Sequence, residues 1–210
     1  MTHKPFDLSA AQPRRRSLAR LLALAAAPWV GQTSAQNAVP VSPPCASAAA
    51  ELVSLWRREG GALLVRHAAT EAGLGDPPGF VIGQCRTQRN LSEAGRQASV
   101  AWGAWMRAQA LAPAAVRSSQ WCRCQDTARL AFGQFEDWPA LNSTFAGQGN
   151  PKAQLQALRD RLLAMPAGRK EVWVTHQVIM TGLTGAYPGL GEAFLVDRQG
   201  RLLVRADVAA

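Results

Sequence analysis

Ala62-Leu63-Leu64-Val65-Arg66-His67 is the stretch that decides the fold of this 210-residue chain. Four consecutive apolar residues after Gly60-Gly61 are typical of a short strand that is buried on both faces. Residues 115–118 and 171–175 also predict short strands, and segments with helical periodicity separate the three. This alternation predicts an α/β fold, namely a three-layer α/β/α sandwich around a mostly parallel central sheet.

The segments around these strands are predicted from periodicity and turn residues. Residues 70–89 hold several Gly and Pro and predict a long loop, and loops this long in a compact domain are usually functional. Residues 193–196 and 202–205 predict a terminal hairpin. Helices are expected where apolar residues recur with a period near 3.6: at 46–58, after the N-cap Ser92, at 127–132, from Pro151 to about 165, and from 176 through 183.

The first 35 residues predict a secretory signal peptide. Three arginines at 14–16 precede an apolar run at 21–30, and small residues lead up to a cleavage site after Ala35. The run is about ten residues, shorter than the roughly 20 that cross a bilayer, so no stable membrane span is expected. The arginine pair followed by Leu18 resembles a twin-arginine signal, and the general secretory route is the alternative.

We therefore expect a periplasmic or secreted protein in three parts. Residues 1–35 are the signal peptide, residues 36–45 are a Pro-rich flexible lead-in, and residues 46–210 are a single domain with room for a sizeable core. An N-terminal helix that packs on the domain is the alternative to a signal peptide. The sequence leaves the oligomeric state open.

The basic residues are mostly arginines dispersed along the chain. The formal net charge is +9, and the first 35 residues, with five basic and one acidic residue, leave +5 for the remainder. Of the 18 basic residues after the signal, 16 are arginines, whose planar fork suits phosphate or carboxylate. The composition favours an anionic small-molecule ligand, and the lack of a basic run after the signal argues against a nucleic-acid partner.

Four cysteines, Cys45, Cys85, Cys122 and Cys124, follow the signal. An even number in an exported chain permits disulfides, with three possible pairings, and we expect Cys45 or Cys85 to take part in one. The alternative is a metal site or reactive thiol pair at Cys122 and Cys124. Their Cys-x-Cys spacing is unlike that of structural zinc sites, so no metal or cofactor is expected.

Two histidines and an arginine follow the predicted strands. His67 comes directly after the first strand, His176 directly after the third, and Arg123 shortly after the second. In open α/β sheets, ligands bind beyond the carboxyl ends of the strands. Three separate elements are therefore expected to bring His67, His176 and Arg123 to one edge of the sheet, beside Arg66.

Four motifs occur in order over roughly residues 60–185. They are Arg66-His67-Ala68-Ala69-Thr70, residues 91–98 (Leu-Ser-Glu-Ala-Gly-Arg-Gln-Ala), Ser119 with Arg123 four residues later and then Thr127-Ala128, and Thr175-His176. In this combination they resemble the motifs of the histidine phosphatase superfamily, which has the phosphoglycerate-mutase-like fold.

The resemblance implies a metal-independent phosphatase that hydrolyses phosphate esters or anhydrides of small molecules. His67 would be the nucleophile and form a covalent phosphohistidine. Arg66 and Arg123 would bind the phosphoryl oxygens, and His176 would donate a further hydrogen bond. Thr70 would cap the phosphate pocket through its hydroxyl or, equally, stabilise the loop. In that loop Arg86 and Arg89 are weaker candidates for binding the anionic groups of a substrate, and we expect both side chains to be exposed to solvent.

The chain departs from the family at the general acid. Many members place a glutamate after the second-arginine helix, but residues 141–145 contain no carboxylate, and Gln177 stands where another branch has an aspartate. The acid would then be Glu71, Asp76 or Glu192, which the sequence does not rank. The missing glutamate also motivates the alternative function, a catalytically weak or inactive protein that binds phosphorylated ligands. A third reading is a redox or zinc protein built on Cys122 and Cys124.

Overall fold

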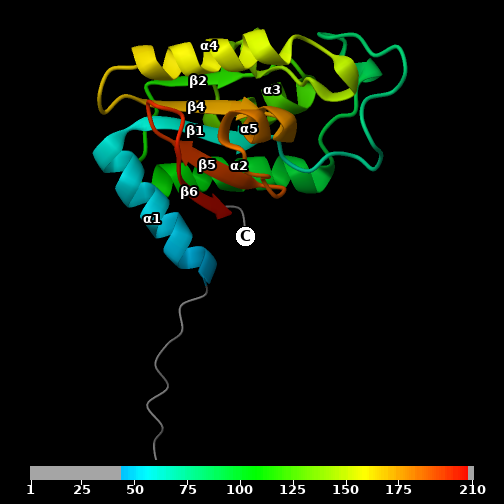
Figure 1. Cartoon of the computed structure of the whole chain (residues 1–210). Helices are drawn as coiled ribbons and strands as arrows, with labels where there is room; N and C mark the ends of the chain where they lie inside the picture. Colours follow the sequence, from blue (N-terminus) through cyan, green and yellow to red (C-terminus); the bar gives the residue numbers. More distant parts are fainter. Residues whose placement is uncertain (1–43, 208–210) are drawn as a thin grey trace, which may run out of the picture. The chain divides into compact units, whose positions relative to one another are not determined.

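A six-stranded sheet forms the centre of the computed structural model, which describes residues 44–207 and the side chains from residue 48 onward (Figure 1). The predicted signal peptide and most of the predicted lead-in lie outside the described residues. In sheet order the strands are β3 (Glu136–Asp137), β2 (Ala115–Ser118), β4 (Lys170–Thr175), β1 (Gly61–Arg66), β5 (Glu192–Val196) and β6 (Leu202–Asp207).

The strands pair in parallel on one side of β1 and antiparallel on the other. β3, β2, β4 and β1 are parallel, whereas β5 and β6 form the predicted terminal hairpin. Three of the five pairings in the described part of the chain are thus parallel, which confirms the predicted α/β class. β3, a strand of two acidic residues, was not predicted.

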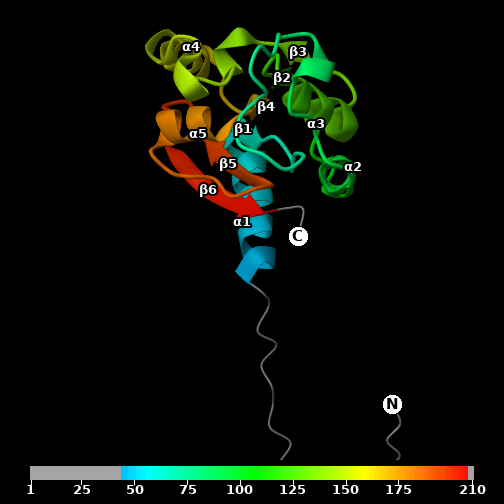
Figure 2. The same ribbon diagram turned by 90° about the vertical axis from the view of Figure 1, so that its right-hand side faces the viewer.

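Within residues 44–207, five helices lie on the two faces of the sheet (Figure 2). On one face, α1 (Pro44–Glu59), α2 (Glu93–Ala108) and α3 (Cys122–Phe132) share a hydrophobic cluster with the strands. On the other face, α4 (Pro151–Ala164) and α5 (Gln177–Thr184) share a second cluster. The predicted three-layer sandwich is confirmed. None of these helices combines the length and hydropathy that crossing a bilayer requires.

The central strand β1 contributes side chains to both clusters. Leu63 and Val65 pack against the helices of one face, and Ala62 and Leu64 pack against those of the other. All four are at most 3% exposed. Because successive side chains of a strand point to opposite faces, burial on both sides explains why this stretch has no polar residue.

The register of the central strands brings their carboxyl ends to one edge. Arg66, the last residue of β1, pairs with Thr175, the last residue of β4. In the same way Ser118, at the end of β2, lies beside Val174 of β4. The residues that follow these strands, beginning with His67 and His176, therefore leave the sheet at adjacent points.

Helix α3 begins earlier than predicted. The sequence predicted a helix over 127–132, whereas α3 begins at Cys122, so that Arg123 lies in its first turn instead of in the preceding loop. The segment Cys-Arg-Cys-Gln-Asp has no apolar helical period, which is why it was not recognised. The earlier start places the Arg123 side chain on a rigid element.

A disulfide joins the long loop after β1 to the start of α3. Cys85 pairs with Cys122, with 5.6 Å between their Cα atoms. The prediction that Cys85 or Cys45 takes part in a disulfide is confirmed for Cys85, whereas the Cys45 side chain lies outside the described residues. Cys124 is a buried free thiol. The cross-link joins this loop to the residue that directly precedes Arg123.

A buried carboxylate stabilises the opposite edge of the sheet. Glu171, near the start of β4, has a fully buried side chain that accepts hydrogen bonds from Arg169 Nε at 2.8 Å, Trp173 Nε1 at 3.0 Å, and Arg161. Burial works to raise the pKa of Glu171, but the hydrogen bonds from these partners outweigh it and lower the pKa to about 2. The charge is therefore retained well below neutral pH.

Candidate active site

The two predicted histidines lie against each other at the carboxyl edge of the sheet. The ring centroids of His67 and His176 are 5.4 Å apart, with the rings inclined at 66°. Both side chains are almost fully buried, and both line one cavity of about 370 Å³. The same cavity is lined by Arg66 and Arg123, so four of the predicted site residues come together, from the ends of β1 and β4 and the start of α3.

His67 is held as a neutral ring with one free nitrogen. Its Nδ1 lies 2.9 Å from the carbonyl oxygen of Ala68. Because a carbonyl oxygen only accepts, Nδ1 carries the proton and Nε2 keeps a lone pair. Burial, followed by the charge of Arg123, lowers the pKa of His67 to about 3. The ring is thus unprotonated at neutral pH, as a nucleophile must be.

The turn that follows His67 is fixed by α2 and α3. The backbone nitrogen of Ala68 donates to Thr127 Oγ1 at 3.1 Å, and the same hydroxyl donates to the carbonyl of Arg123 at 2.7 Å. At the start of α2, a Cβ on Gly95 would lie 1.9 Å from the carbonyl oxygen of Ala69. Glycine is therefore required at position 95 for α2 to approach Ala69 so closely. Thr127 and Gly95, which both belong to the family-like motifs, thus have structural roles in this turn.

Three guanidinium groups line the cavity, one more than predicted. Arg66 donates through Nη1 to the carbonyl of Pro188 at 3.2 Å, and Arg89 donates through Nη1 to that of Gly73 at 2.6 Å. The Nε atoms of Arg66, Arg89 and Arg123 are buried and have no hydrogen-bond partner in the described structure. Buried donors are normally paired, so three unpaired guanidinium N–H groups around one cavity indicate an anion site.

The expectation that Arg89 is exposed is wrong. Arg86 is exposed as expected, but Arg89 is half-buried and lines the cavity. Four residues before Arg89, the disulfide at Cys85 joins the loop to the start of α3, and this tertiary contact constrains the direction of Arg89. A loop composition rich in Gly and Pro contains no signal of that contact.

Of the three candidate acids, Asp76 is the one that lines the cavity. Glu71 is exposed, and Glu192 is bound by Arg205 and by the backbone nitrogen of Gly189. The Asp76 side chain is 8% exposed and forms an ion pair of 2.7 Å with Arg123 Nη1. Burial works to raise the pKa of Asp76, but the hydrogen bond and charge of Arg123 lower it on balance.

Ser119 and Cys124 both contact the ring of His176. Its Nε2 lies 2.8 Å from Ser119 Oγ and 3.4 Å from Cys124 Sγ. The serine hydroxyl has one proton, and its contact to His176 is shorter than its 3.2 Å contact to Asn142 Oδ1. If this proton is donated to Nε2 instead of to Asn142, the ring proton of His176 lies on Nδ1. Burial, and then the neighbouring ring of His67, lowers the pKa of His176 well below its usual value.

Thr70 lies outside the cavity lining. Its backbone pairs with Leu91 in an isolated bridge that closes the long loop, which suits the loop-stabilising role rather than a contact with phosphate. The mouth of the cavity is instead lined by the exposed side chains of Leu74, Phe145 and Tyr187, at 90%, 48% and 62% exposure. Sequence patterns did not point to these three, because they lie on irregular segments.

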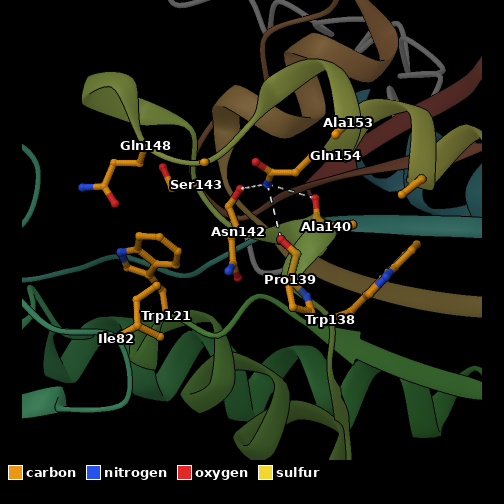
Figure 3. Close-up of a pocket in the computed structure, with 12 residues that line it drawn as sticks. Ile82, Trp121, Trp138, Pro139, Ala140, Asn142, Ser143, Gln148, Ala153 and Gln154 are labelled. Carbon is orange, nitrogen blue, oxygen red and sulfur yellow. Dashed lines mark hydrogen bonds between the residues drawn. The ribbon is translucent and has the colours of Figure 1, made fainter.

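A second cleft of about 500 Å³ adjoins the cavity and shares Trp121, Ser143 and Gln148 with it (Figure 3). Its lining contains no ionisable side chain, and Ile82, Trp138 and Pro139 give it a largely apolar surface. The guanidinium groups are thus confined to the first cavity. The arrangement offers a charged site for a phosphoryl group beside an uncharged surface.

The cysteines do not form a metal or thiol centre in the described structure. Cys122 is consumed by the disulfide, and burial raises the pKa of the Cys124 thiol to about 12, so this thiol is protonated and a poor nucleophile. Residues 44–207 contain no group of three or more His, Cys, Asp or Glu side chains that could hold a metal ion. The ionisable side chains that line the cavity are those of Arg66, His67, Asp76, Arg89, Arg123, His176 and Tyr187.

Comparison with known proteins agrees with this geometry. Residues 62–148 match the family model "Histidine phosphatase superfamily (branch 1)", which confirms the resemblance inferred from the motifs. No curated protein matches the chain. Among solved structures, a putative alpha-ribazole-5'-P phosphatase from Escherichia coli matches with 16% identity and a TM-score of 0.52, covering 70% of this chain and 96% of that one.

Two further matches carry the name SixA. The protein histidine phosphatase SixA complexed with tungstate matches with 16% identity and a TM-score of 0.47, covering 70% of this chain and 96% of that one. The putative phosphohistidine phosphatase SixA from Agrobacterium tumefaciens matches with 16% identity and a TM-score of 0.46, covering 69% and 96%. At such identities, structural similarity indicates at most a shared fold and leaves the substrate undefined.

Proposed function

We propose that this chain, which carries the histidine phosphatase superfamily pattern over residues 62–148, is an exported phosphatase that forms a covalent phosphohistidine on His67. Its substrates are phosphate esters or anhydrides of small molecules. The observation that carries the proposal is the meeting of one unprotonated imidazole with three guanidinium groups whose buried Nε atoms have no partner. An anion bound by these donors lies beside a ring that is ready to attack it.

The reaction follows from these positions. The phosphoryl group binds to Arg66, Arg89 and Arg123, whose N–H groups stabilise the charge that spreads over its oxygens during transfer. Nε2 of His67 attacks the phosphorus atom while the bond to the leaving oxygen breaks. Water then attacks the phosphohistidine, and phosphate leaves. Because the guanidinium groups already supply positive charge, the proposed mechanism uses no metal ion.

His176 acts on the same phosphoryl group. Ser119 Oγ lies 2.8 Å from its Nε2. In the proposed mechanism the hydroxyl donates to Nε2, and the ring presents Nδ1–H to a phosphoryl oxygen. The donor is neutral, so it binds the oxygens without repelling the neighbouring arginines. His176 therefore stabilises the transition state and takes no covalent part.

Export is supported by the sequence of the first 35 residues and by the disulfide. Disulfides persist in oxidising compartments such as the periplasm and are rare in the cytosol of most organisms. The Cys85–Cys122 link closes a functional loop, so its formation supports a periplasmic or secreted site of action. A fusion of residues 1–35 to a reporter that is active only after export tests this part of the proposal.

The alternative function is a phosphate-ligand-binding protein that does not turn over. It is motivated by residues 141–145, which lack the glutamate of many relatives. A panel of phosphorylated metabolites, assayed with wild type and with His67→Ala, separates the two functions. We expect hydrolysis by wild type, and a loss of at least about 10³-fold in the variant because the nucleophile is removed. Tight binding without hydrolysis across the panel would instead establish the binding protein.

A further inference from the structure

The geometry points to a proton donor at a position that the family-like motifs do not cover: we propose that Asp76 protonates the leaving oxygen. This inference rests on the proposed function and completes it. Asp76 lies on the long loop between β1 and α2, and its side chain is one of the most enclosed in the cavity wall. The other carboxylates considered, Glu71 and Glu192, do not line the cavity.

Three donors hold the Asp76 carboxylate in place. Oδ1 accepts from Arg123 Nη1 at 2.7 Å and from the backbone nitrogen of Arg89 at 3.0 Å, and Oδ2 accepts from Trp121 Nε1 at 3.0 Å. Only one of these partners, Arg123, is a group that the phosphoryl ligand would also bind. The two neutral contacts can remain when Arg123 turns to the substrate, so the carboxylate keeps its place beside the bound phosphoryl group.

The loop that carries Asp76 is joined to the start of α3 by two links. The disulfide joins Cys85 to Cys122, and the Gln88 side chain accepts from the backbone nitrogen of Cys122 at 3.0 Å while donating to Val81 at 3.0 Å. A loop of this composition would otherwise be mobile. These links give Asp76 the fixed position that a catalytic acid requires.

The charges around Asp76 change when substrate binds. In the free protein the carboxylate is ionised, because the hydrogen bond and charge of Arg123 and the hydrogen bonds from the Arg89 backbone and Trp121 lower its pKa, and both imidazoles are neutral. A phosphoryl dianion neutralises those guanidinium groups and places negative charge beside the carboxylate. A neighbouring like charge favours the protonated acid, so Asp76 takes up a proton as substrate binds.

The proton then follows the bonds. When Nε2 of His67 forms the bond to phosphorus, the bond from phosphorus to the leaving oxygen breaks and its electron pair stays on that oxygen. Asp76 gives its proton to this oxygen, which departs as an alcohol, and the carboxylate is restored. In the second step water forms a bond to phosphorus, Asp76 accepts the water proton, and the phosphorus–nitrogen bond breaks with its electron pair returning to His67.

A series of phosphate monoesters with leaving groups from dinitrophenol to simple alcohols tests this role in Asp76→Asn. Asparagine keeps the shape and can accept from Trp121 and Arg89, but it cannot donate an acidic proton. We expect kcat/KM for alkyl esters to fall by about 10²–10⁴-fold, and for the dinitrophenyl ester by less than about 10-fold. The matched control Glu71→Gln, an exposed carboxylate of the same loop, should leave both unchanged.

Two further measurements exclude a merely structural role. Binding of inorganic phosphate at pH 8, followed by calorimetry in buffers of different ionisation enthalpy, should show a proton uptake in wild type that Asp76→Asn lacks. The same variant should bind phosphate at least as tightly as wild type, because Arg123 loses its anionic partner. Weaker phosphate binding, or an equal loss for all leaving groups, would overturn the proposal.

The failure of this inference is distinct from failure of the proposed function. The dinitrophenyl ester needs no acid, so it should phosphorylate His67 in both wild type and Asp76→Asn. Suppose that both proteins form the phosphohistidine and that Asp76→Asn lowers kcat/KM equally for all leaving groups. The proposed phosphatase function would then be supported, and Asp76 would not be its acid.

Discussion

Thr127 Oγ1 lies 3.1 Å from the backbone nitrogen of Ala68, which fixes helix α3 to the turn that carries the proposed nucleophile. The same oxygen donates to the carbonyl of Arg123 at 2.7 Å. One hydroxyl therefore links the turn of the proposed nucleophile, His67, to Arg123, the most buried of the three arginines that line the cavity. This coupling, rather than any direct contact with substrate, gives Thr127 its importance.

The variant Thr127→Val keeps the shape of the side chain and removes both hydrogen bonds. We expect the free energy of unfolding to fall by about 1–3 kcal/mol, because the buried nitrogen of Ala68 loses its partner. We also expect kcat to fall, since His67 and Arg123 are no longer held in register. Chemical denaturation and steady-state kinetics measure the two effects.

Thr184→Val is the matched control for that substitution. Thr184 makes the same pair of contacts on α5, donating to the carbonyl of Met180 at 2.7 Å and accepting from Ala186 at 3.2 Å. The Thr184→Val substitution should lower the free energy of unfolding without lowering kcat. A Thr127→Val enzyme with wild-type kcat would show that the coupling does not matter for catalysis.

Arg89 is predicted to bind the phosphoryl group together with Arg66 and Arg123. Replacing it by methionine keeps much of the side-chain length and removes the charge. A hydrogen bond to a charged group contributes about 1.5–3 kcal/mol, so inhibition by inorganic phosphate should weaken by roughly 10- to 150-fold. Arg86→Met, an exposed arginine on the same loop, should not change the inhibition constant. Equal effects of the two variants on the inhibition constant would show that Arg89 contributes only general positive charge and does not bind phosphate directly.

Glu171 predicts how stability depends on acid. Its pKa is lowered from 4.5 to about 2 in the folded protein, so the folded state binds fewer protons than the unfolded state between these values. The stabilisation is complete above about pH 4.5 and is lost as the pH falls through 2; by linkage it amounts to about 3 kcal/mol. Denaturation curves between pH 7 and pH 3 should show the larger part of this loss in wild type.

The Glu171→Gln variant should be less stable at pH 7 and show a flatter acid dependence, because a neutral amide cannot balance Arg161 and Arg169. Glu136→Gln, which removes an exposed carboxylate paired with Arg117 at 3.1 Å, should change stability by less than about 1 kcal/mol. A parallel acid profile of wild type and Glu171→Gln would assign the acid sensitivity to other groups. Neither variant should alter kcat, since Glu171 lies at the opposite edge of the sheet from His176.

The meeting of Arg66, His67 and His176 was predictable because these residues lie at the carboxyl ends of neighbouring strands. The apolar runs before Arg66 and before His176 marked two buried strands, and parallel pairing alone then places the following residues side by side. The terminal hairpin was predictable for a similar reason, since its turn residues and apolar runs are local in sequence. Nothing beyond neighbouring residues was needed for either inference.

The rest depended on contacts between distant segments. The inward direction of Arg89 depends on the disulfide between Cys85 and Cys122, one of the pairings that the sequence left open. Asp76 could not be ranked above Glu71 for the same reason, because the path of the loop is set by that link and by Gln88. Loop residues acquire their orientation from tertiary contacts that periodicity does not encode.

Covalent phosphorylation of His67 is the most direct test of the proposed phosphatase. Wild type mixed with a dinitrophenyl phosphate ester and quenched in base should carry an acid-labile phosphoryl group on His67, and phosphorus NMR should place it on Nε2, because Nδ1 is bound to the Ala68 carbonyl. His67→Ala should show neither the adduct nor turnover. Sustained hydrolysis by His67→Ala, or an adduct at any other residue, would contradict the proposed mechanism.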